Sequence, residues 1–460
     1  MMNNELIKCF IDILGEDGVV TDEDDLFCYS YDATPNVAAA LPDVVLIPRT
    51  TQDVAEIVKI AARHKIPVYT RGAGTNLSGG SVPVKNGILL SMLEMDRIIE
   101  IDRENLTATV EAGVVIQSLN DAVEPIGLLY PPDPGTVQTA TIGGSVAECS
   151  GGLRGLKYGI TRDYVMGVKA VLADGSVVDF GGKTVKNVSG FDMRAIFCGS
   201  EGMLGIITEV LLKLLPKPQS RQSMMVIYSD LDCAANTIRD IIYEKIIPAT
   251  MEILDNTTIR AVEEYKNIGL PVDAEAILLI EVDGAEAAVE LEAKQVKSIC
   301  TNCGADRIEV AGDDSKRDEI WAARRAALPA LVRMSPTSIL EDATVPRSKI
   351  PEMIRAVRAI AEKYNIRIGT FGHAGDGNLH PTILTDERDA DEMERVNKAI
   401  KEIFENALAL GGTLSGEHGI GMAKAAFMPL QFSEAELSIM KNLKRAFDPD
   451  NILNPGKVFS

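Results

Sequence analysis

Glycine is concentrated between positions 143 and 205 of this chain, and this concentration limits what the chain can fold into. The four clusters are Thr141-Ile-Gly-Gly-Ser-Val146, Ser150-Gly-Gly-Leu-Arg-Gly-Leu-Lys-Tyr-Gly159, Gly181-Gly-Lys-Thr184 and Gly199-Ser-Glu-Gly-Met-Leu-Gly205. Glycine adopts positive φ easily and lets the backbone approach a bound molecule closely. So many glycines in one stretch indicate turns, ligand-contacting loops, or both.

Alternating strand and helix patterns precede the glycine clusters. Asp43-Val-Val-Leu-Ile47 reads as a buried strand, and apolar residues from Val54 to Ala61 repeat at helical spacing after Thr50-Thr51, which can cap the helix. Pro67-Val-Tyr-Thr70 is the next predicted strand and leads directly into Arg71-Gly-Ala-Gly-Thr-Asn-Leu-Ser-Gly-Gly80. This order predicts a mixed α/β region with glycine at the end of a strand.

Two common nucleotide-binding motifs are missing from the glycine loops. The dinucleotide fingerprint fails because Leu77 stands where Gly72-Ala-Gly74 would need a third glycine. A Walker loop fails because Val177 stands where the first glycine should precede Gly182-Lys-Thr184. Several separated glycine loops remain, and their backbone N–H groups could form an anion nest for a long ligand that contains a pyrophosphate.

Three of the four histidines fall in a short C-terminal stretch: His373, His380 and His418. An Asp-Gly pair favours a two-residue hairpin turn, so a turn at Asp376-Gly377 would place His373 opposite His380. Their Cβ atoms would then lie roughly 5 Å apart, which suits a single metal ion. Glu417 is the candidate third ligand of a site with an open position. The alternative is a set of surface or hydrogen-bonded histidines.

A domain boundary is predicted at Leu215-Pro-Lys-Pro-Gln-Ser220, where two prolines interrupt a strand-like run. The region beyond it carries Trp321-Ala-Ala-Arg-Arg325 and has a second α/β pattern. Two helices should flank the predicted hairpin, one around residues 353–360 and one around residues 393–404 that ends near Gly411-Gly412.

Composition excludes several classes of protein. The 460 residues are 46% hydrophobic and 25% charged, enough for two or three domains with real cores. A net charge of −21, from 67 acidic and 46 basic residues, disfavours nucleic acid or an anionic membrane as the main partner. No apolar run approaches the roughly 20 residues of a membrane span. Glu5 stands where a signal peptide would be basic, so a cytoplasmic location is predicted.

The seven cysteines form an odd, scattered set, at positions 9, 28, 149, 198, 233, 300 and 303. This pattern fits free thiols in a reducing compartment better than a disulfide framework. Only Cys300-Thr-Asn-Cys303 has ligand-like spacing. A single such pair favours ordinary packing over a zinc or iron–sulfur site.

Several motifs together resemble a known family. They are Pro48-Arg-Thr-Thr-Gln-Asp-Val54, Arg71 to Gly80, Pro131-Pro-Asp-Pro-Gly-Thr136, Thr141-Ile-Gly-Gly144, Gly199-Ser-Glu-Gly202, Asn454-Pro-Gly-Lys457, His373-Ala-Gly-Asp-Gly-Asn-Leu-His380 and Gly416-Glu-His-Gly419. From about residue 40 onward the chain resembles the FAD-linked oxidases of the vanillyl-alcohol oxidase superfamily. Within that superfamily it is most similar to the glycolate oxidase D-subunit and FAD-dependent D-lactate dehydrogenase family.

The resemblance implies an α+β fold with three segments. Residues 1–219 would form an FAD-binding domain of two α/β subdomains, and residues 220–415 a substrate domain built on an antiparallel sheet that carries the hairpin. Residues 416–460 would return to the FAD-binding domain.

The resemblance also implies site residues. His373, His380 and Glu417 would bind a divalent metal, His418 would be the catalytic base, and Arg324 would hold the substrate carboxylate. The alternative for Arg324 is a surface salt bridge. Zinc is the default metal for two histidines and a carboxylate, and ferrous iron or manganese also suits them. The implied FAD-binding residues are Pro48, Arg71, Gly72, Ala73, Gly74, Thr75, Asn76, Ser78, Gly79, Pro134, Gly135, Thr141, Gly144, Ser145, Gly152, Tyr158, Glu201, Gly205, Ile206 and Asn454.

The implied reaction is FAD-dependent oxidation of a small D-2-hydroxy acid to the 2-oxo acid. Pro381-Thr382 gives no sign of a long-diacid pocket, which favours a small substrate such as lactate or glycolate over 2-hydroxyglutarate. D-Lactate is the preferred substrate, and glycolate and D-2-hydroxyglutarate are the alternatives. The expected electron acceptor is an electron-transferring flavoprotein or another soluble protein. Two further alternatives are a flavin-free metallohydrolase and a non-catalytic subunit that only relays electrons.

Overall fold

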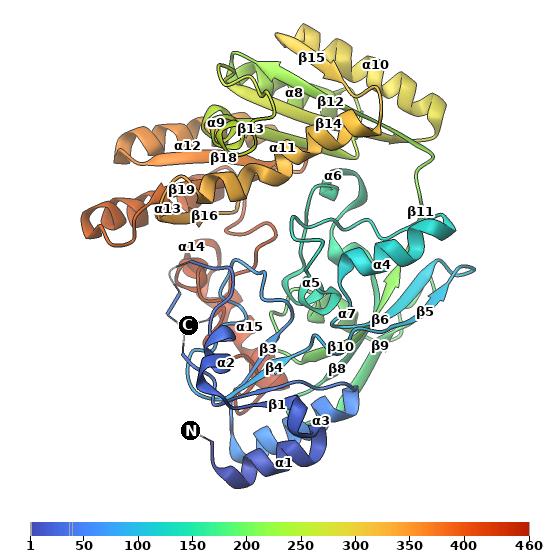
Figure 1. Ribbon diagram of the computed structural model, residues 1–460, viewed down its shortest axis with the longest axis vertical. Coiled ribbons are helices and arrows are strands. Elements are labelled where there is room, and N and C mark those ends of the chain that lie inside the picture. Colours follow the sequence, from blue (N-terminus) through green and yellow to red (C-terminus); the bar gives the residue numbers. More distant parts are fainter. Residues whose placement is uncertain (1, 36, 39, 460) are drawn as a thin grey trace. The chain divides into compact units, whose positions relative to one another are not determined.

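A computed structural model describes residues 2–35, 37–38 and 40–459 (Figure 1). The chain divides into two compact units. Unit 1 consists of Met1–Ser150, Ile160–Lys217 and Glu417–Ser460, and unit 2 consists of Gly151–Gly159 and Pro218–Gly416. The predicted segments differ from these units chiefly at Gly151–Gly159, which the sequence had assigned to the FAD-binding domain and which groups with unit 2.

The first sheet of unit 1 has four strands in the order β1-β2-β4-β3. Its bounds are β1 (Val19–Val20), β2 (Val44–Leu46), β3 (Val68–Arg71) and β4 (Ile88–Ser91). β2 and β3 each pair parallel with β4, and β1 pairs antiparallel with β2. Helices α1 (Asn4–Leu14) and α3 (Thr51–His64) pack on its apolar side chains, and α2 (Glu23–Cys28) precedes β2. Thr50 and Asp53 form a capping box at the start of α3, which confirms the predicted strand–helix–strand order.

The second sheet of unit 1 is antiparallel, with the order β5-β6-β10-β8-β9. Its strands are β5 (Ile98–Asp102), β6 (Thr107–Glu111), β8 (Val165–Val171), β9 (Val177–Gly181) and β10 (Ile206–Lys213). β7 (Leu128–Leu129) and β11 (Leu215–Pro216) make a small two-stranded sheet. The associated helices are α4 (Ile116–Val123), α5 (Ile142–Glu148) and α7 (Met193–Phe197).

The C-terminal segment of unit 1 completes the first sheet. It contains α14 (Met428–Gln431) and α15 (Glu434–Phe447). Val68 N donates to Ile452 O at 2.7 Å, and Asn454 N donates to Val68 O at 2.8 Å. Residues 452–454 therefore extend the sheet at the edge formed by β3.

Unit 2 is built on an eight-stranded antiparallel sheet, ordered β15-β12-β14-β13-β18-β19-β16 with β17 paired to β19. The strands are β12 (Ser220–Tyr228), β13 (Thr250–Asp255), β14 (Ala276–Gly284), β15 (Arg307–Val310), β16 (Thr337–Leu340), β17 (Ala343–Thr344), β18 (Arg367–His373) and β19 (Asn378–Thr385). The helices are α6 (Gly155–Tyr158), α8 (Leu231–Tyr243), α9 (Asn256–Lys266), α10 (Glu286–Asn302), α11 (Asp314–Val332), α12 (Ile350–Tyr364) and α13 (Ala390–Ala409). The two helices predicted beside the histidine hairpin are confirmed as α12 and α13.

The two faces of the unit 2 sheet are covered by different helices. Leu254 and Phe371 pack with α9 and α11 in one apolar core. Ile253 and Ile368, whose positions alternate with these, face α8 and α12. Helix α11, which carries Arg324, runs along the first face (Figure 1).

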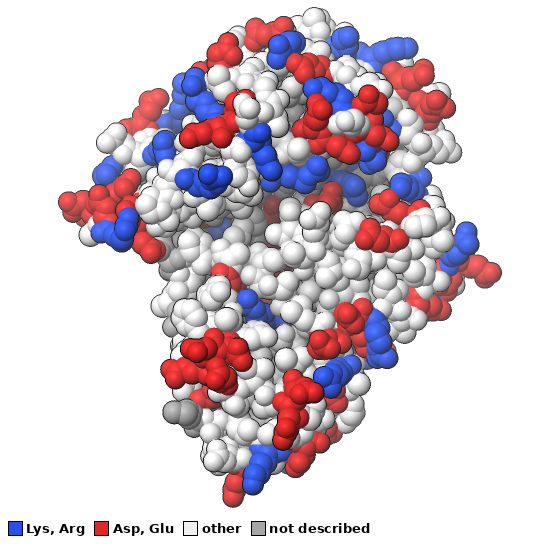
Figure 2. Space-filling model, viewed as in Figure 1, with Lys and Arg blue, Asp and Glu red and all other residues white. Residues whose placement is uncertain are grey.

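The antiparallel unit 2 sheet and the helices around it confirm the predicted α+β class. No helix within the described residues is long and apolar enough to cross a bilayer. Acidic and basic side chains both occur on the face drawn in Figure 2.

Candidate active site

The histidine hairpin forms, but its register differs from the predicted one. His373 pairs with Asn378, and Phe371 pairs with His380. The predicted two-residue turn is wrong, because residues 374–377 make a four-residue loop in which Gly377 N donates to His373 O at 3.2 Å. A shift of two residues keeps a side chain on the same face of a sheet. The imidazoles therefore still meet, with ring centroids 5.1 Å apart and ring planes at 89°.

Glu252 on β13 holds His373 in place, and the sequence analysis missed it. Its carboxylate lies 2.8 and 3.0 Å from His373 Nδ1 and is completely buried. A carboxylate at Nδ1 favours a proton on that nitrogen and leaves Nε2 for a metal. The sequence feature that could have revealed Glu252 is a charged residue inside the apolar run Thr250-Met-Glu-Ile-Leu-Asp255.

Arg324 is part of the same cluster. Its Nε donates to Glu252 Oε2 at 2.5 Å, and its guanidinium carbon lies 4.7 Å from the centre of the Phe371 ring. The residue is only 9% exposed, so the alternative of a surface salt bridge is wrong. Glu252 thus joins Arg324 and His373, which the sequence had predicted as site residues without linking them.

Asp342 adds a second carboxylate beside the histidines. One carboxylate oxygen of Asp342 lies within 4.8 Å of a ring nitrogen of His380. A ring nitrogen of His373 also lies within 4.8 Å of a ring nitrogen of His380. Asp342 Oδ2 also accepts hydrogen bonds from Ser415 Oγ at 2.7 Å and from Gly416 N at 2.8 Å. Asp342 therefore anchors the last residues of unit 2, directly before Glu417.

Glu417 and His418 are the first two residues of the last segment of unit 1. Glu417 Oε1 lies 3.7 Å from His418 Nε2, and the two side chains are 12% and 14% exposed. The backbone just beyond them is fixed, because Glu201 accepts hydrogen bonds from Ile420 N at 2.8 Å and from Gly421 N at 2.6 Å. Both predicted residues are therefore held in a short segment that is anchored at each end.

The loop from Arg71 to Gly80 follows β3 and folds around Asn76. Asn76 Oδ1 accepts hydrogen bonds from Ser78 N at 3.3 Å and from Gly80 N at 3.0 Å. Gly74 has φ +69°, and a side chain there would collide with the Arg71 guanidinium. Gly72 packs on Thr141, whose Oγ1 caps α5 by accepting from Gly144 N at 3.2 Å. The predicted residues Arg71–Asn76, Ser78, Gly79, Thr141, Gly144 and Ser145 are thus brought together.

Two carboxyl groups, the half-buried Glu148 and the buried Glu201, lie beside this loop. Burial raises the pKa of both. Ser78 Oγ donates to Glu148 Oε1 at 3.3 Å, and Glu148 Oε2 is buried without a hydrogen-bond partner. The Asn454 amide donates to Gly80 O at 2.9 Å and to Glu201 O at 2.7 Å. A glycine-rich loop beside a buried, unpartnered carboxyl oxygen is a fitting cradle for a polar cofactor.

Lys457 was also missed by the sequence analysis. Its ammonium group donates to Gly79 O at 2.7 Å and to Val82 O at 2.5 Å and is nearly fully buried. Burial lowers the pKa of Lys457 to about 8, with Asp32, Glu201 and Glu148 opposing that shift. A buried cation below the loop adds to its attraction for an anionic ligand.

The remaining predicted FAD-binding residues belong to other elements. Gly152 and Tyr158 belong to unit 2, where Tyr158 Oη donates to Asp283 Oδ2 at 2.6 Å. Gly205 packs against the Phe197 ring, and the buried Ile206 begins β10. Pro48, Pro134 and Gly135 lie in connecting segments.

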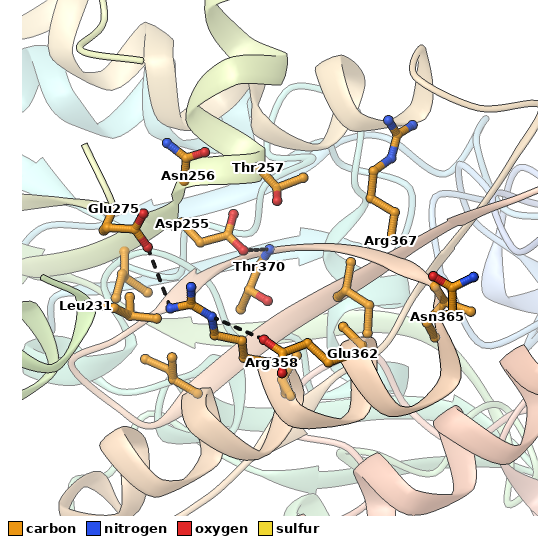
Figure 3. A pocket seen from close by; sticks show the side chains of 16 residues that line it. Leu231, Asp255, Asn256, Thr257, Glu275, Arg358, Glu362, Asn365, Arg367 and Thr370 are labelled. Atoms are coloured by element: carbon orange, nitrogen blue, oxygen red, sulfur yellow. Dashed lines mark hydrogen bonds and ion pairs between the residues drawn. The ribbon is translucent and has the colours of Figure 1, made fainter. Parts of the chain in front are cut away.

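A cavity of about 410 Å³ lies on the other face of the unit 2 sheet (Figure 3). Its walls include Ile253, Asp255, Ile368 and Thr370, which alternate with the strand positions of Glu252 and His373. Asp255 accepts a hydrogen bond from Thr370 N at 2.7 Å, and burial raises the pKa of Asp255 to about 6. The cavity is therefore separate from the histidine cluster.

Comparison with known families identifies both halves of the chain. A model described as FAD binding domain matches residues 42–181, and one described as FAD linked oxidases, C-terminal domain matches residues 217–458. The chain belongs to the FAD-linked oxidase family. The family resemblance drawn from the motifs is confirmed, and the chain is an FAD-linked oxidoreductase.

Individual relatives show which members of the FAD-linked oxidase family this chain resembles. The chain is 49% identical over 460 residues to glycolate oxidase subunit GlcD of Bacillus subtilis, covering 100% of this chain and 98% of the relative. It is 35% identical over 468 residues to D-lactate dehydrogenase of Anaerostipes hadrus, covering 99% and 97%. These relatives place this FAD-linked oxidase in the glycolate oxidase and D-lactate dehydrogenase family.

Solved structures agree on the fold. Substrate-bound p-cresol methylhydroxylase gives a TM-score of 0.80 at 20% identity, covering 99% of this chain and 96% of that one. An alkyldihydroxyacetonephosphate synthase gives a TM-score of 0.79 at 19% identity, covering 99% and 86%. The vanillyl-alcohol oxidase type of fold is therefore confirmed for this FAD-linked oxidase.

Proposed function

We propose that this FAD-linked oxidase converts a small D-2-hydroxy acid to the 2-oxo acid, with D-lactate as the first candidate substrate. The observation that carries the proposal is the buried pair His373 and His380, with Glu252 at Nδ1 of His373. Such a pair can hold a metal ion, and a 2-hydroxy acid can chelate one through its hydroxyl and carboxylate oxygens.

The residues present fit a divalent metal. His373 offers Nε2 because Nδ1 faces Glu252, and His380 lies on the same face of the hairpin. Glu417 is the proposed third ligand. It directly follows Gly416, whose N donates to Asp342 Oδ2 at 2.8 Å. Zinc, ferrous iron and manganese all accept this donor set.

Each bound group would supply one kind of chemistry. A divalent ion would lower the pKa of the substrate hydroxyl and fix the direction of the Cα–H bond. FAD would accept the hydride at N5.

The chain's own residues would orient the substrate and move its proton. His418 would take the hydroxyl proton as general base. Arg324 would bind the carboxylate with its planar fork, while Glu252 at Nε and the Phe371 ring fix the plane of the guanidinium. Glu252 would then serve both the substrate-binding arginine and the metal-binding histidine.

Glycolate is the second candidate substrate. It lacks only the methyl group of D-lactate and offers the same two oxygens to a metal. The 49% identity to a protein named glycolate oxidase subunit favours it. D-2-Hydroxyglutarate is the third, because Pro381-Thr382 after the second histidine offers no cation for a distal carboxylate.

The proposed electron acceptor is another protein, with an electron-transferring flavoprotein first. The relatives named as subunits of glycolate oxidase support a multi-protein assembly. A cytoplasmic location is proposed with it, supported by seven cysteines that are all free.

Anaerobic stopped-flow spectroscopy tests the substrate. D-Lactate should bleach the flavin absorbance fastest, followed by glycolate, whereas L-lactate should leave it unchanged. A faster response to glycolate would reverse the order of the candidates. If all the 2-hydroxy acids left the flavin oxidised, the proposal would fail. That result would favour the alternative of a non-catalytic subunit that only relays electrons.

Removal of the metal tests the remaining rival. Chelator treatment should abolish flavin reduction while the flavin stays bound, and zinc, ferrous iron or manganese should restore the reduction. Full activity in a demonstrably metal-free sample would refute the metal role. A metallohydrolase, in contrast, would be purified without flavin absorbance.

A further inference from the structure

Two cysteines of unit 1 lie side by side at the ends of two helices. Cys149 ends α5 with φ +56°, a left-handed position where glycine or asparagine is usual. Cys198 ends α7. The residues after Cys198 are bound to the last turn of α5, because Gly199 N donates to Val146 O at 2.9 Å and Glu201 N donates to Ala147 O at 2.9 Å. These bonds place the residue after Cys198 against Cys149, because a side-chain carbon at Gly199 would lie 3.5 Å from Cys149 Cβ.

The sulfur of Cys149 accepts a hydrogen bond from Arg162 Nε at 3.0 Å. The neighbouring Cys198 side chain, and then the side chain of Arg162 acting against burial, lower the pKa of the Cys149 thiol to about 6. The same pairing raises the pKa of Cys198.

The pKa values of three other cysteines are shifted in the opposite direction from that of Cys149. Burial raises the pKa of the Cys300 thiol to about 11. Burial, and then carboxylates, raise the pKa of Cys233 and Cys303, and Cys303 Sγ donates to Asp240 Oδ2 at 3.4 Å. Because the thiolate is the reactive form, Cys149 is a better nucleophile than Cys233, Cys300 or Cys303. It is 4% exposed, yet Cys198 is partly exposed and Arg162 is exposed, so a molecule as small as a peroxide can reach the pair.

We propose that Cys149 and Cys198 form a peroxide-reactive thiol pair that closes to a disulfide, a modification site separate from the proposed oxidation of hydroxy acids. The Cys149 thiolate attacks one peroxide oxygen, the O–O bond breaks, and the departing hydroxide takes a proton to become water. The Cys198 sulfur, after losing its proton to solvent, then attacks the resulting sulfenic sulfur. The S–O bond breaks and a second water leaves. The two thiols lose two electrons, and the peroxide becomes two waters.

Thiol counting on the full chain, with its flavin retained, tests the pair. The protein is treated with one equivalent of hydrogen peroxide, denatured, and alkylated with N-ethylmaleimide for intact-mass analysis. The seven cysteines should fall to five alkylated ones, seven minus two, with recovery of all seven after reduction. Peptide mapping should show Cys149 linked to Cys198. Seven alkylated cysteines, or a linkage between other cysteines, would overturn the proposal.

Variants separate the two steps. Cys198→Ser should stop at a sulfenic acid on Cys149 that dimedone captures, whereas Cys149→Ser should lose the fast reaction. Cys28→Ser, at an exposed cysteine, is the matched control and should react like the original chain. In the unmodified chain, the rate of Cys149 alkylation by a small methanethiosulfonate should rise with a midpoint near pH 6. A midpoint near the ordinary value of about 8.5 would contradict the thiolate assignment and with it the proposal.

Discussion

The histidine hairpin of unit 2 and the Arg71–Gly80 loop of unit 1 are built in opposite ways. On the hairpin, side chains from β18 and β19 provide the functional atoms, and regular strands fix their positions. In the loop, backbone amides and glycines would provide the proposed binding surface, while the half-buried Asn76 and the buried Lys457 hold the loop from behind. The hairpin should therefore be sensitive to changes in side-chain chemistry, and the loop to changes in backbone shape.

The largest expected effect is at the hairpin. His380→Ala should remove the metal and lower flavin reduction by about a thousandfold, since metal stabilisation of the transition state is worth several kcal/mol. Metal analysis and anaerobic flavin reduction measure the two losses, and flavin content should not change. His64→Ala, at an exposed histidine of α3, is the matched control. Flavin loss in His380→Ala would break the contrast between the two regions.

The next effect concerns the buried lysine behind the loop. Because burial lowers the folded pKa of Lys457 to about 8, the folded state releases this proton before the unfolded state does. The free energy of unfolding of flavin-free unit 1 should therefore rise between about pH 8 and pH 10.5, by at most about 3 kcal/mol, and stay level below pH 8 with respect to this group.

Two probes can separate the units in that experiment. The one tryptophan, Trp321, lies in unit 2, so its fluorescence reports unit 2, whereas circular dichroism reports both units. Lys457→Met should flatten the pH-dependent rise seen by circular dichroism and leave the tryptophan transition in place. An identical pH dependence in the variant would show that Lys457 does not titrate in this range.

A smaller effect is expected at Glu252. Glu252→Gln should weaken metal binding by about 10- to 100-fold, because a carboxylate orients the histidine ligand and raises its basicity. Competition with a chromogenic chelator measures the affinity without any need for turnover. Glu281→Gln is the matched control, since Glu281 is also buried but accepts from Trp321 Nε1 at 3.1 Å. Equal metal affinity in the Glu252 variant and the original chain would remove its positioning role.

The smallest effect is at the loop. Gly74→Ala should weaken FAD binding by about tenfold, because a left-handed position costs an alanine roughly 1–2 kcal/mol and the new methyl group meets the Arg71 guanidinium. Flavin retained on gel filtration measures this loss. Gly127→Ala tests positive φ alone, because Gly127 is also left-handed (φ +79°) with open space around it. Metal loss in Gly74→Ala with FAD retained would contradict the separation of the two regions.

Local patterns predicted the elements well where caps and periodicity agreed. Thr50 with Asp53 marks the start of α3, and the two helices around the hairpin follow their apolar spacing. The hairpin register failed because the Asp376-Gly377 rule considers only local turn preference. In the structure, Gly375 N donates to Met251 O at 3.0 Å, so a bond from a neighbouring strand helps to fix the wider loop.

The candidate site was predicted only in part, because some of its contacts join residues that are far apart in the sequence. His373 and His380 are seven residues apart, so a local motif reveals them. Glu252 meets His373 across 121 positions of sequence, and Asp342 binds Gly416 across 74, so only the fold brings these partners together. Lys457 closes the Arg71–Gly80 loop in the same long-range way.

The bond between Val68 and the segment at residues 452–454 has a consequence for biosynthesis. The chain passes between the units at residues 150/151, 159/160, 217/218 and 416/417, and the strand edge at Val68 receives its neighbour only after residue 454 has been made. Translation therefore delivers all of unit 2 while the flavin-binding unit still lacks a strand partner. A ribosome-bound nascent chain that ends before residue 452 should leave this edge open to chaperones.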